Sequence, residues 1–274
     1  MKFGLLGEHL GHSLSPQIHK LIFEKLGLEH TYDLIELKPE ELADFLANAG
    51  QAYGGVNVTI PYKVPVMEGL KTVSLDAKDI GAVNTIRFQG ELGFGFNTDY
   101  FGFGRMLEHN AISLSGKKVV MLGNGGAAKA VLQYILSSSP EEILVVARDI
   151  AKAQEKLANF VEREEKIQFV SYEQLHGYKG DVMINTTSVG MFPKVLASPV
   201  AAEDLNGYEA AVDIIYNPEE TKFLTQAKSA GCKICNGLYM LVAQAVASEE
   251  IWLERKLPDS LIAEVEGDLR RMIL

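Results

Sequence analysis

Two hydroxyls and a pair of charged groups in the first hundred residues could bind and react with a small polar molecule. Ser13 and Ser15 precede a predicted helix with Pro16 in its first turn, where hydroxyl and backbone N–H groups can hold a carboxylate. Ser15 could instead only cap that helix. Lys63 could act as a general acid or base, or be a solvated surface lysine. Asp99 could orient Lys63, or cap the helix that follows it.

Other amide and hydroxyl side chains stand on neighbouring predicted elements. Asn57 and Thr59 point to one face of the strand that precedes Lys63, because side chains alternate along a strand. Asn84 stands in an otherwise apolar strand, and Gln244 interrupts the apolar segment Met240–Ala247. Gln244 could therefore bond a ligand or only another side chain.

A glycine-rich turn between a predicted strand and a predicted helix is typical of dinucleotide binding. It consists of Gly123, Asn124, Gly125, Gly126, Ala127 and Ala128. The first glycine permits a tight turn, the second lets the backbone approach a pyrophosphate, and the small last residue allows the helix to pack closely on the strand. The N–H groups at the helix N-terminus then face the phosphates. A purely structural turn is the alternative.

The end of the next strand should contact the adenosine ribose, and this chain offers both a cation and an acid there. Arg148 suits the 2′-phosphate of NADP, and Lys152, one helical turn later, could join it. Asp149 could bond the ribose of NAD or only cap the following helix. Two cations against one acid favour NADP over NAD.

These residues must be positioned by alternating strands and helices. The first hundred residues predict helices at 15–26 and 39–48, and strands at 2–6, 32–37, 56–60, 82–88 and 92–96. The rest predicts a helix after the glycine turn, helices at 100–110, 151–160 and 238–256, and strands at 117–122, 143–147, 167–170, 182–185, 211–214 and 233–235. This alternation predicts an α/β fold with a parallel sheet of βαβ units. The last helix should pack back on the first domain.

Composition limits the classes of partner. The 274 residues carry 26 Lys and Arg against 36 Asp and Glu, a net charge of −10, and 47% are apolar. These values are ordinary for a soluble globular protein, and the acidic balance argues against nucleic acid or an anionic membrane as partner. Neither a signal peptide nor a transmembrane helix is expected, and a cytoplasmic location is predicted.

Cys232 and Cys235 have the spacing of a metal or redox motif, but no second pair and no histidine cluster supports one. On a strand, positions three apart face opposite sides of the sheet. We therefore expect the cysteines to pack in the interior and expect no metal site. Two thiols without a disulfide framework also fit a reducing cytosol.

Taken together, these motifs resemble the shikimate dehydrogenase family in its free-standing bacterial form. The resemblance spans nearly the whole chain, in ordered blocks at 13–16, 57–63, 81–85, 97–99, 123–128, 185–191, 213–218 and 237–244. It implies two α/β domains with a cleft between them, namely a substrate-binding domain at 1–99 completed by 238–274 and a Rossmann domain at 100–237. It also implies NADPH-dependent, reversible reduction of 3-dehydroshikimate to shikimate in aromatic amino acid biosynthesis, by a monomer or homodimer.

The resemblance assigns roles to individual residues. Lys63 would be the acid–base residue and Asp99 its partner. The substrate carboxylate would be held by Ser13, Ser15 and Tyr216, and the ring hydroxyls by Asn57, Thr59, Asn84, Asp99 and Gln244. The cofactor would be held by the glycine turn together with Arg148, Asp149, Lys152, Thr187, Met191 and Gly237.

Some positions depart from the family pattern and keep alternatives open. Arg148-Asp149 follows Ala147 where the family commonly has Asn-Arg-Thr, which leaves NAD open as cofactor, and Tyr100 replaces a glycine. The close alternative is a quinate/shikimate dehydrogenase that uses NAD, although Ser15 favours shikimate. The others are a methylenetetrahydrofolate dehydrogenase-like enzyme and a non-catalytic nucleotide- or shikimate-binding regulator. Such a regulator would be expected to lose the lysine or aspartate that this chain keeps.

Overall fold

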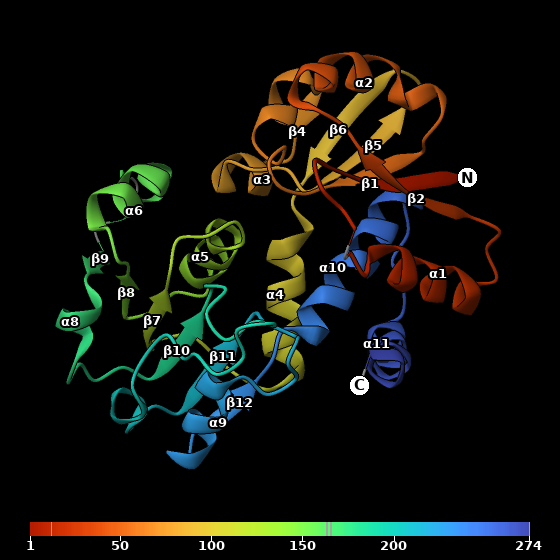
Figure 1. Cartoon of the computed structure of the whole chain (residues 1–274). Coiled ribbons are helices and arrows are strands. Elements are labelled where there is room, and N and C mark those ends of the chain that lie inside the picture. The colour runs from red at the N-terminus through yellow and green to blue at the C-terminus, as the bar shows by residue number, and fades with distance from the viewer. Residues whose placement is uncertain (12, 163, 165, 274) are drawn as a thin grey trace. The chain divides into compact units, whose positions relative to one another are not determined.

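Two six-stranded sheets organise the chain. The computed structural model of the protein describes residues 1–11, 13–162, 164 and 166–273, and in this part of the chain each sheet belongs to one of two compact units. Unit 1 comprises Met1–Gly102 with Val242–Leu274, and unit 2 comprises Phe103–Leu241. The chain passes from one unit to the other inside α4 (Thr98–His109) and returns inside α10 (Leu238–Trp252) (Figure 1). The predicted α/β fold class is confirmed.

The sheet of unit 1 is mixed. Its order is β2-β1-β3-β5-β6-β4, with β2, β1 and β3 parallel and β5 antiparallel to both β3 and β6. The strands are β1 (Lys2–Gly7), β2 (Thr31–Glu36), β3 (Gly55–Val58), β4 (Thr72–Val73), β5 (Thr85–Gln89) and β6 (Leu92–Phe96). All four residues of β3 are buried, because protein covers both faces of this central strand. The predicted hairpin of β5 and β6 is confirmed, with Gly90 at a φ of 59° in its turn.

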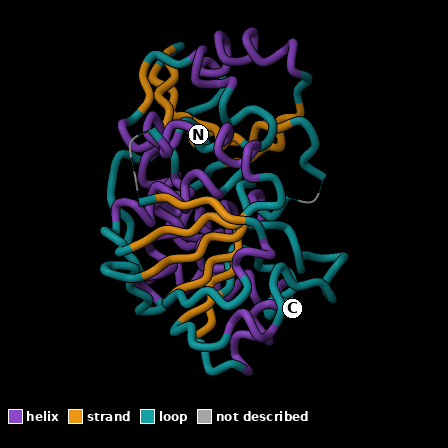
Figure 2. The backbone as a smooth tube through the Cα atoms, turned by 90° about the vertical axis from the view of Figure 1, so that its left-hand side faces the viewer, coloured by secondary structure: helices purple, strands orange, loops and turns teal. Residues whose placement is uncertain are grey.

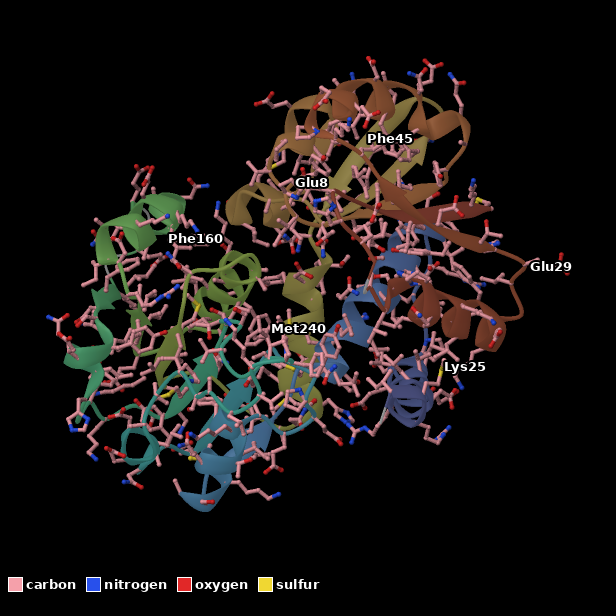
Figure 3. The ribbon with its side chains drawn as sticks, viewed as in Figure 1. Glu8, Lys25, Glu29, Phe45, Phe160 and Met240 are labelled. Carbon is pink, nitrogen blue, oxygen red and sulfur yellow. The ribbon has the colours of Figure 1, made fainter. Side chains whose placement is uncertain are left out.

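Helices lie on both faces of this sheet, with α2 on one side and α1, α10 and α11 on the other (Figure 1). The helices within unit 1 are α1 (Ser15–Leu26), α2 (Leu42–Asn48), α3 (Leu75–Ile80), α11 (Ser260–Ile273) and the 3-10 helices η1 (Pro39–Glu41), η2 (Ala49–Gln51) and η3 (Pro65–Gly69). Helix α1 has Pro16 in its first turn and ends at Gly27, whose φ is 64°, as predicted. It packs against α11, and Lys25 Nζ lies 2.8 Å from Asp268 Oδ2 (Figure 3).

Three predicted elements of unit 1 are corrected by the structure. The helix expected at 39–48 is η1 followed by α2. The strand expected at 56–60 ends at Val58, because Pro61 has no N–H to continue the ladder and the chain turns outward. The strand expected at 82–88 begins at Thr85, because Val83 N donates to the carbonyl oxygen of Lys63 at 2.7 Å instead of to a strand.

The C-terminal segment is two helices rather than one. Helix α10 ends at Trp252 and α11 begins at Ser260. Glu254 between them has a φ of 50°, and Pro258 precedes α11, so no helix can run through this stretch. The predicted return of this segment to the first domain is confirmed, because Trp252 Nε1 donates to the carbonyl oxygen of Ile86 at 2.9 Å.

The sheet of unit 2 is wholly parallel, with the order β12-β11-β10-β7-β8-β9. Figure 2 shows strands of the structure lying side by side. Its strands are β7 (Lys118–Leu122), β8 (Glu142–Val146), β9 (Ile167–Val170), β10 (Val182–Asn185), β11 (Ala210–Asp213) and β12 (Lys233–Cys235). The direction of winding reverses between β7 and β10, which is the topology of a Rossmann sheet. Ligands of such sheets bind at the carboxyl ends of the strands at this reversal.

The helices of unit 2 are α5 (Ala128–Ser137), α6 (Ile150–Lys156), α7 (Ala158–Val161), α8 (Tyr172–Leu175), α9 (Lys222–Ser229) and the 3-10 helix η4 (Ala202–Leu205). The single helix expected at 151–160 is wrong, because Leu157, with a φ of −108°, separates α6 from α7. Phe160 of α7 is fully buried, and this side chain holds α7 on the unit (Figure 3).

Both cysteines are buried free thiols. Cys232 belongs to the apolar core of unit 2, so its predicted packing role is confirmed. Among the described residues, no group of three or more His, Cys, Asp and Glu side chains could hold a metal ion. Within the same residues, no helix combines the length and apolar character that crossing a membrane requires.

Candidate active site

Ser13 and Ser15 form a hydroxyl pair at the start of α1. Ser13 Oγ donates to Ser15 Oγ at 3.1 Å, and Ser15 N donates back to Ser13 Oγ at 3.2 Å. The N-cap residue of α1 is Leu14, so the alternative that Ser15 caps this helix is wrong. Both serines are half-buried, so their hydroxyls can reach an anion held at the helix N-terminus.

The amide of Asn57 lies at the centre of a buried polar cluster in unit 1. Tyr32 OH donates to Asn57 Oδ1 at 2.8 Å. Asn57 Nδ2 donates to Ser248 Oγ at 2.8 Å and to Thr85 Oγ1 at 3.0 Å. Sequence reasoning missed Tyr32, Thr85 and Ser248, because only the fold brings strands β2 and β5 and helix α10 to this amide.

Two further predicted binding residues lie on or next to the elements that contribute to this cluster. Gln244 is half-buried one turn before Ser248 on α10, and Ser248 Oγ donates to the carbonyl oxygen of Gln244 at 3.0 Å. Thr59 is half-buried just after β3, and a Cβ atom added at Gly7 would lie 2.8 Å from its Cγ2 atom. In the described part of the chain, no side-chain hydrogen bond joins Thr59 to the cluster.

Asn84 fixes the start of α4, the helix that carries Asp99. Asn84 Oδ1 accepts from Thr98 N at 2.7 Å and from Thr98 Oγ1 at 3.2 Å. Asn97 Oδ1 also accepts from Tyr100 N at 3.4 Å. Two asparagines therefore bond the first N–H groups of α4, and the alternative that Asp99 is its N-cap is wrong.

Lys63 and Asp99 form a close ion pair. Lys63 Nζ lies 2.7 Å from Asp99 Oδ2, and the two side chains are 19% and 14% exposed. This partial exposure leaves the ammonium group accessible to a bound molecule, while the carboxylate fixes its direction. The pair can therefore deliver a proton to an oxygen of a ligand or accept one from it. The contact predicted from the sequence is present.

The glycine turn lies at the carboxyl end of β7, next to β10. Gly123 has a φ of 94°, and a Cβ atom there would lie 2.5 Å from Thr187 Cγ2, so only glycine fits. Gly125 and Gly126 are exposed, whereas Ala128 is buried where α5 begins. The turn therefore opens backbone N–H groups to a ligand at the point where the sheet reverses. These residues fit the pyrophosphate of a dinucleotide.

The carboxyl end of β8 carries the predicted cations. Arg148 and Lys152 are exposed, and Arg148 is close enough to Tyr172 to lower the pKa of its phenol against the larger, raising effect of burial. Asp149 Oδ1 accepts from Lys152 N at 3.0 Å, so the capping alternative for Asp149 is confirmed. A contact of Asp149 with a ribose stays a prediction.

Lys129 is a cation that sequence reasoning missed. It stands in the first turn of α5, directly after the glycine turn, and is half-buried. Burial lowers the pKa of Lys129, and the nearby charge of Lys156 lowers it further. A cation at a helix N-terminus is unfavourable by itself, so its presence there supports an anionic ligand.

The loops after β10 and β11 are joined by the carboxylate of Asp213. Asp213 Oδ1 accepts from Asn185 Nδ2 and Ile215 N, both at 3.0 Å, and Asp213 Oδ2 accepts from Thr221 Oγ1 at 2.7 Å. Asn185 Oδ1 in turn accepts from Thr187 Oγ1 at 2.7 Å. The buried carboxylate of Asp213 thus holds, through Asn185, the loop that contains Thr187. Thr187 faces Gly123 of the glycine turn. The sequence contained this aspartate in a motif but gave no sign of its partners.

Asp213 should make the stability of the protein depend on pH. Burial raises the pKa of its carboxyl from 3.8 to about 6, against the lowering effect of three hydrogen bonds. Between pH 3.8 and about pH 6, the folded protein therefore binds more protons than the unfolded chain. The stabilisation that comes from protonated Asp213 is complete below pH 3.8 and is lost as the pH rises through about 6. The loss is about 3 kcal/mol in the free energy of unfolding.

Urea unfolding of the wild type and of Asp213→Asn, at about pH 4 and about pH 7, measures this effect. The asparagine keeps an oxygen acceptor and cannot titrate, and all other titrating groups cancel in the difference. The wild type should lose about 2.4 kcal/mol relative to the variant over this range. If the free energies of unfolding of the wild type and the variant differ by the same amount at both pH values, the pH dependence does not come from Asp213.

Three other predicted residues follow the carboxyl ends of β10, β11 and β12. Met191 is 45% exposed, in the loop after β10. Tyr216 is half-buried, and burial raises the pKa of its phenol. Gly237 allows close packing, because a Cβ atom there would lie 2.0 Å from the carbonyl oxygen of Ile214. Tyr216 belongs to unit 2 and the serine pair to unit 1, so a shared carboxylate site stays a prediction.

A Rossmann sheet with a glycine turn at its reversal, and a second α/β unit with a Lys–Asp pair and a polar cluster, define a dinucleotide-dependent dehydrogenase. Two family models match the chain: the shikimate dehydrogenase substrate binding domain over residues 5–86, and shikimate / quinate 5-dehydrogenase over residues 105–207. The chain belongs to the shikimate dehydrogenase family.

Individual relatives agree with this family over nearly the whole chain. The shikimate dehydrogenase (NADP(+)) of Clostridium beijerinckii is 45% identical over 260 residues, which cover 94% of each chain. A chorismate mutase/shikimate 5-dehydrogenase fusion protein from Clostridium acetobutylicum is 46% identical, with a TM-score of 0.93 and coverage of 99% of this chain and 98% of that one. Shikimate 5-dehydrogenase from Thermus thermophilus, in complex with NADP(H) and shikimate, is 34% identical, with a TM-score of 0.87 and coverage of 98% and 99%.

Proposed function

We propose that this chain is an oxidoreductase that catalyses the reversible NADPH-dependent reduction of 3-dehydroshikimate to shikimate. The observation that carries the proposal is the 2.7 Å contact between Lys63 Nζ and Asp99 Oδ2. Asp99 follows Thr98, whose hydroxyl lies 3.2 Å from Ser248 Oγ of the polar cluster. An acid–base pair therefore stands next to a set of groups suited to a hydroxylated substrate.

The chemistry requires a proton as well as a hydride. When bound, the reduced nicotinamide supplies the hydride that the carbonyl carbon gains. The Lys63 ammonium donates its proton to the carbonyl oxygen, which becomes the hydroxyl of shikimate. In the reverse direction, neutral Lys63 removes the proton from that hydroxyl. Asp99 keeps the lysine amine directed at the reacting oxygen.

Unit 1 is proposed to bind the substrate. The hydroxyls of Ser13 and Ser15 are suited to a carboxylate, because two adjacent O–H donors can bond its two oxygens. The side chains proposed to contact ring hydroxyls are those of Asn57, Thr59, Asn84, Asp99 and Gln244. Tyr216 is proposed to contribute a third hydroxyl at the carboxylate end.

Unit 2 is proposed to bind NADP. The glycine turn suits the pyrophosphate, and Arg148 and Lys152 suit the 2′-phosphate, which NAD lacks. Thr187, Met191 and Gly237 lie in loops or turns at the same edge of the sheet and are proposed to line the nicotinamide end. Use of NAD as a slower cofactor is also proposed, because Asp149 stands next to Arg148.

Absorbance of the reduced nicotinamide tests the function directly. The purified protein is mixed with shikimate and NADP, with quinate and NAD as parallel substrates. The fastest reduction is expected with shikimate and NADP. Faster turnover with quinate, or with NAD, would replace the proposed substrate or cofactor with that one. Binding of both ligands without turnover in any combination would leave a regulator instead of an enzyme.

The remaining features of the proposal concern partners and location. The substrate is a small molecule, and the net charge of −10 argues against nucleic acid and anionic membranes as partners. We propose a monomer or homodimer that works in the cytoplasm, where two free thiols stay reduced. Size-exclusion chromatography with light scattering measures the oligomeric state.

A further inference from the structure

Tyr32 lies between Ser15, which is proposed to bind the substrate carboxylate, and Asn57, which is proposed to bind a ring hydroxyl. Its hydroxyl donates to Asn57 Oδ1 at 2.8 Å, and the Ser15 side chain lies close enough to lower the pKa of the phenol as a hydrogen-bond donor. A phenol has one proton, so Ser15 must donate to the Tyr32 oxygen. Ser15 Oγ itself accepts from Ser13 Oγ at 3.1 Å. The four side chains therefore form one directed line, in which Ser13, Ser15 and Tyr32 each donate to the next.

The ring of Tyr32 is held by a buried pair on the neighbouring helices. It stacks on His19 of α1, with ring centroids 4.0 Å apart and planes at 10°. His19 Nδ1 lies 2.6 Å from Glu249 Oε1 of α10, and both side chains have no exposed surface. Among the described residues, His19 Nε2 and Glu249 Oε2 have no hydrogen-bond partner. Burying such a pair is costly, so stability alone does not explain it.

The phenol of Tyr32 stays protonated. Burial, followed by the charge of Glu249, raises its pKa well above the usual value, whereas the hydrogen bond with Ser15 lowers it. The neutral phenol keeps its O–H donor for Asn57. Its role is therefore a fixed one in hydrogen bonding and not one of proton transfer.

We propose that Tyr32 is a substrate-positioning residue, which holds the Ser15 hydroxyl and the Asn57 amide in the orientations that receive a carboxylate and a ring hydroxyl. This inference rests on the proposed function. Without the phenol oxygen, the Asn57 amide loses the donor to its Oδ1 atom and the Ser15 hydroxyl loses its acceptor. Substrate binding then weakens, while the Lys63–Asp99 pair, which Tyr32 does not contact, keeps its geometry.

Steady-state kinetics of Tyr32→Phe test the proposal, with shikimate and NADP as substrates. The phenylalanine keeps the ring and its stack on His19, so the variant should fold and unfold at a temperature close to that of the wild type. The KM for shikimate should rise about tenfold, as expected for one lost hydrogen bond in a binding site. Both kcat and the KM for NADP should stay close to wild-type values. A merely structural role would lower the unfolding temperature and leave the KM for shikimate unchanged.

Tyr53→Phe is the matched control. Tyr53 OH donates to Asp33 Oδ2 of strand β2 at 3.0 Å, so this variant also loses one phenol hydrogen bond. It should leave the KM for shikimate unchanged. If the KM for shikimate is the same in both variants and in the wild type, the positioning role of Tyr32 is overturned, but the proposed function stands. If the wild type does not turn over shikimate, the proposed function itself is overturned.

A double variant tests the route through Ser15. If Tyr32 acts partly by holding the Ser15 hydroxyl, Tyr32→Phe should raise the KM for shikimate less in a Ser15→Ala background than in the wild type. Equal fold-changes in the two backgrounds would overturn this route. This double-mutant cycle compares the KM for shikimate in the wild type, the two single variants and the double variant. It remains informative when the single variants lose some stability, because all four proteins are measured in the folded state.

Discussion

Replacement of Lys63 by alanine is expected to lower kcat for shikimate oxidation by about 10²- to 10⁴-fold, the range that a positioned general acid or base contributes. The methyl group cannot exchange a proton with the reacting oxygen, and no other cation contacts Asp99 in the described residues. The KM for NADP should stay close to the wild-type value, because Lys63 belongs to unit 1 and the glycine turn to unit 2. Initial rates at saturating cofactor measure the effect.

Two variants control this experiment. Lys71→Ala removes an exposed lysine from the same unit and should leave kcat unchanged. Asp99→Asn keeps an oxygen that can accept a hydrogen bond from Lys63 and so still directs its amine, although it removes the negative charge of the ion pair, so kcat should fall less than in Lys63→Ala. Wild-type turnover by Lys63→Ala would exclude this lysine as the acid–base residue.

The second large effect is expected at the cofactor end. Arg148→Ala should raise the KM for NADP by about 10- to 100-fold, as expected for the loss of hydrogen bonds between a guanidinium group and a phosphate. The KM for NAD should change little, because NAD has no 2′-phosphate. The preference for NADP over NAD, measured as a ratio of kcat/KM values, should therefore collapse in this single variant.

Lys179→Ala is the matched control for Arg148→Ala. Lys179 is an exposed cation of the same unit that precedes β10, at the amino ends of the parallel strands. Its removal changes the net charge equally and should leave both cofactor KM values unchanged. An equal loss of NADP affinity in both variants would indicate a general electrostatic effect, and the role of Arg148 would have to be abandoned.

The sequence predicted the Lys63–Asp99 contact because both residues stand at the ends of apolar strands in polar motifs. It predicted the Rossmann sheet for a similar reason, since strand, glycine turn and helix follow one another directly. The position of Gly27 at the end of α1 was also predictable, because the left-handed conformation found there favours glycine.

The remaining features depend on contacts between distant segments. Tyr32 lies in a strand of ordinary pattern, and nothing local indicates that its hydroxyl meets Asn57. The pairing of His19 with Glu249 joins residues 230 positions apart. The division of the C-terminal segment had a local signal in Pro258, but the apolar pattern of α10 concealed where the helix stops.

The order of the two units along the chain has a consequence for biosynthesis. Unit 2 is one continuous segment, Phe103–Leu241, so all of it is synthesised before α11. Unit 1 is different, because Ser248 and Trp252 must arrive to bond Asn57 and the backbone of Ile86. The nascent protein can therefore acquire its dinucleotide fold first, and its polar cluster forms only when the final helices are synthesised. A chain that ended after Leu241 would contain β7 to β12 of the parallel sheet but would lack Ser248 and Trp252 of the acid–base unit.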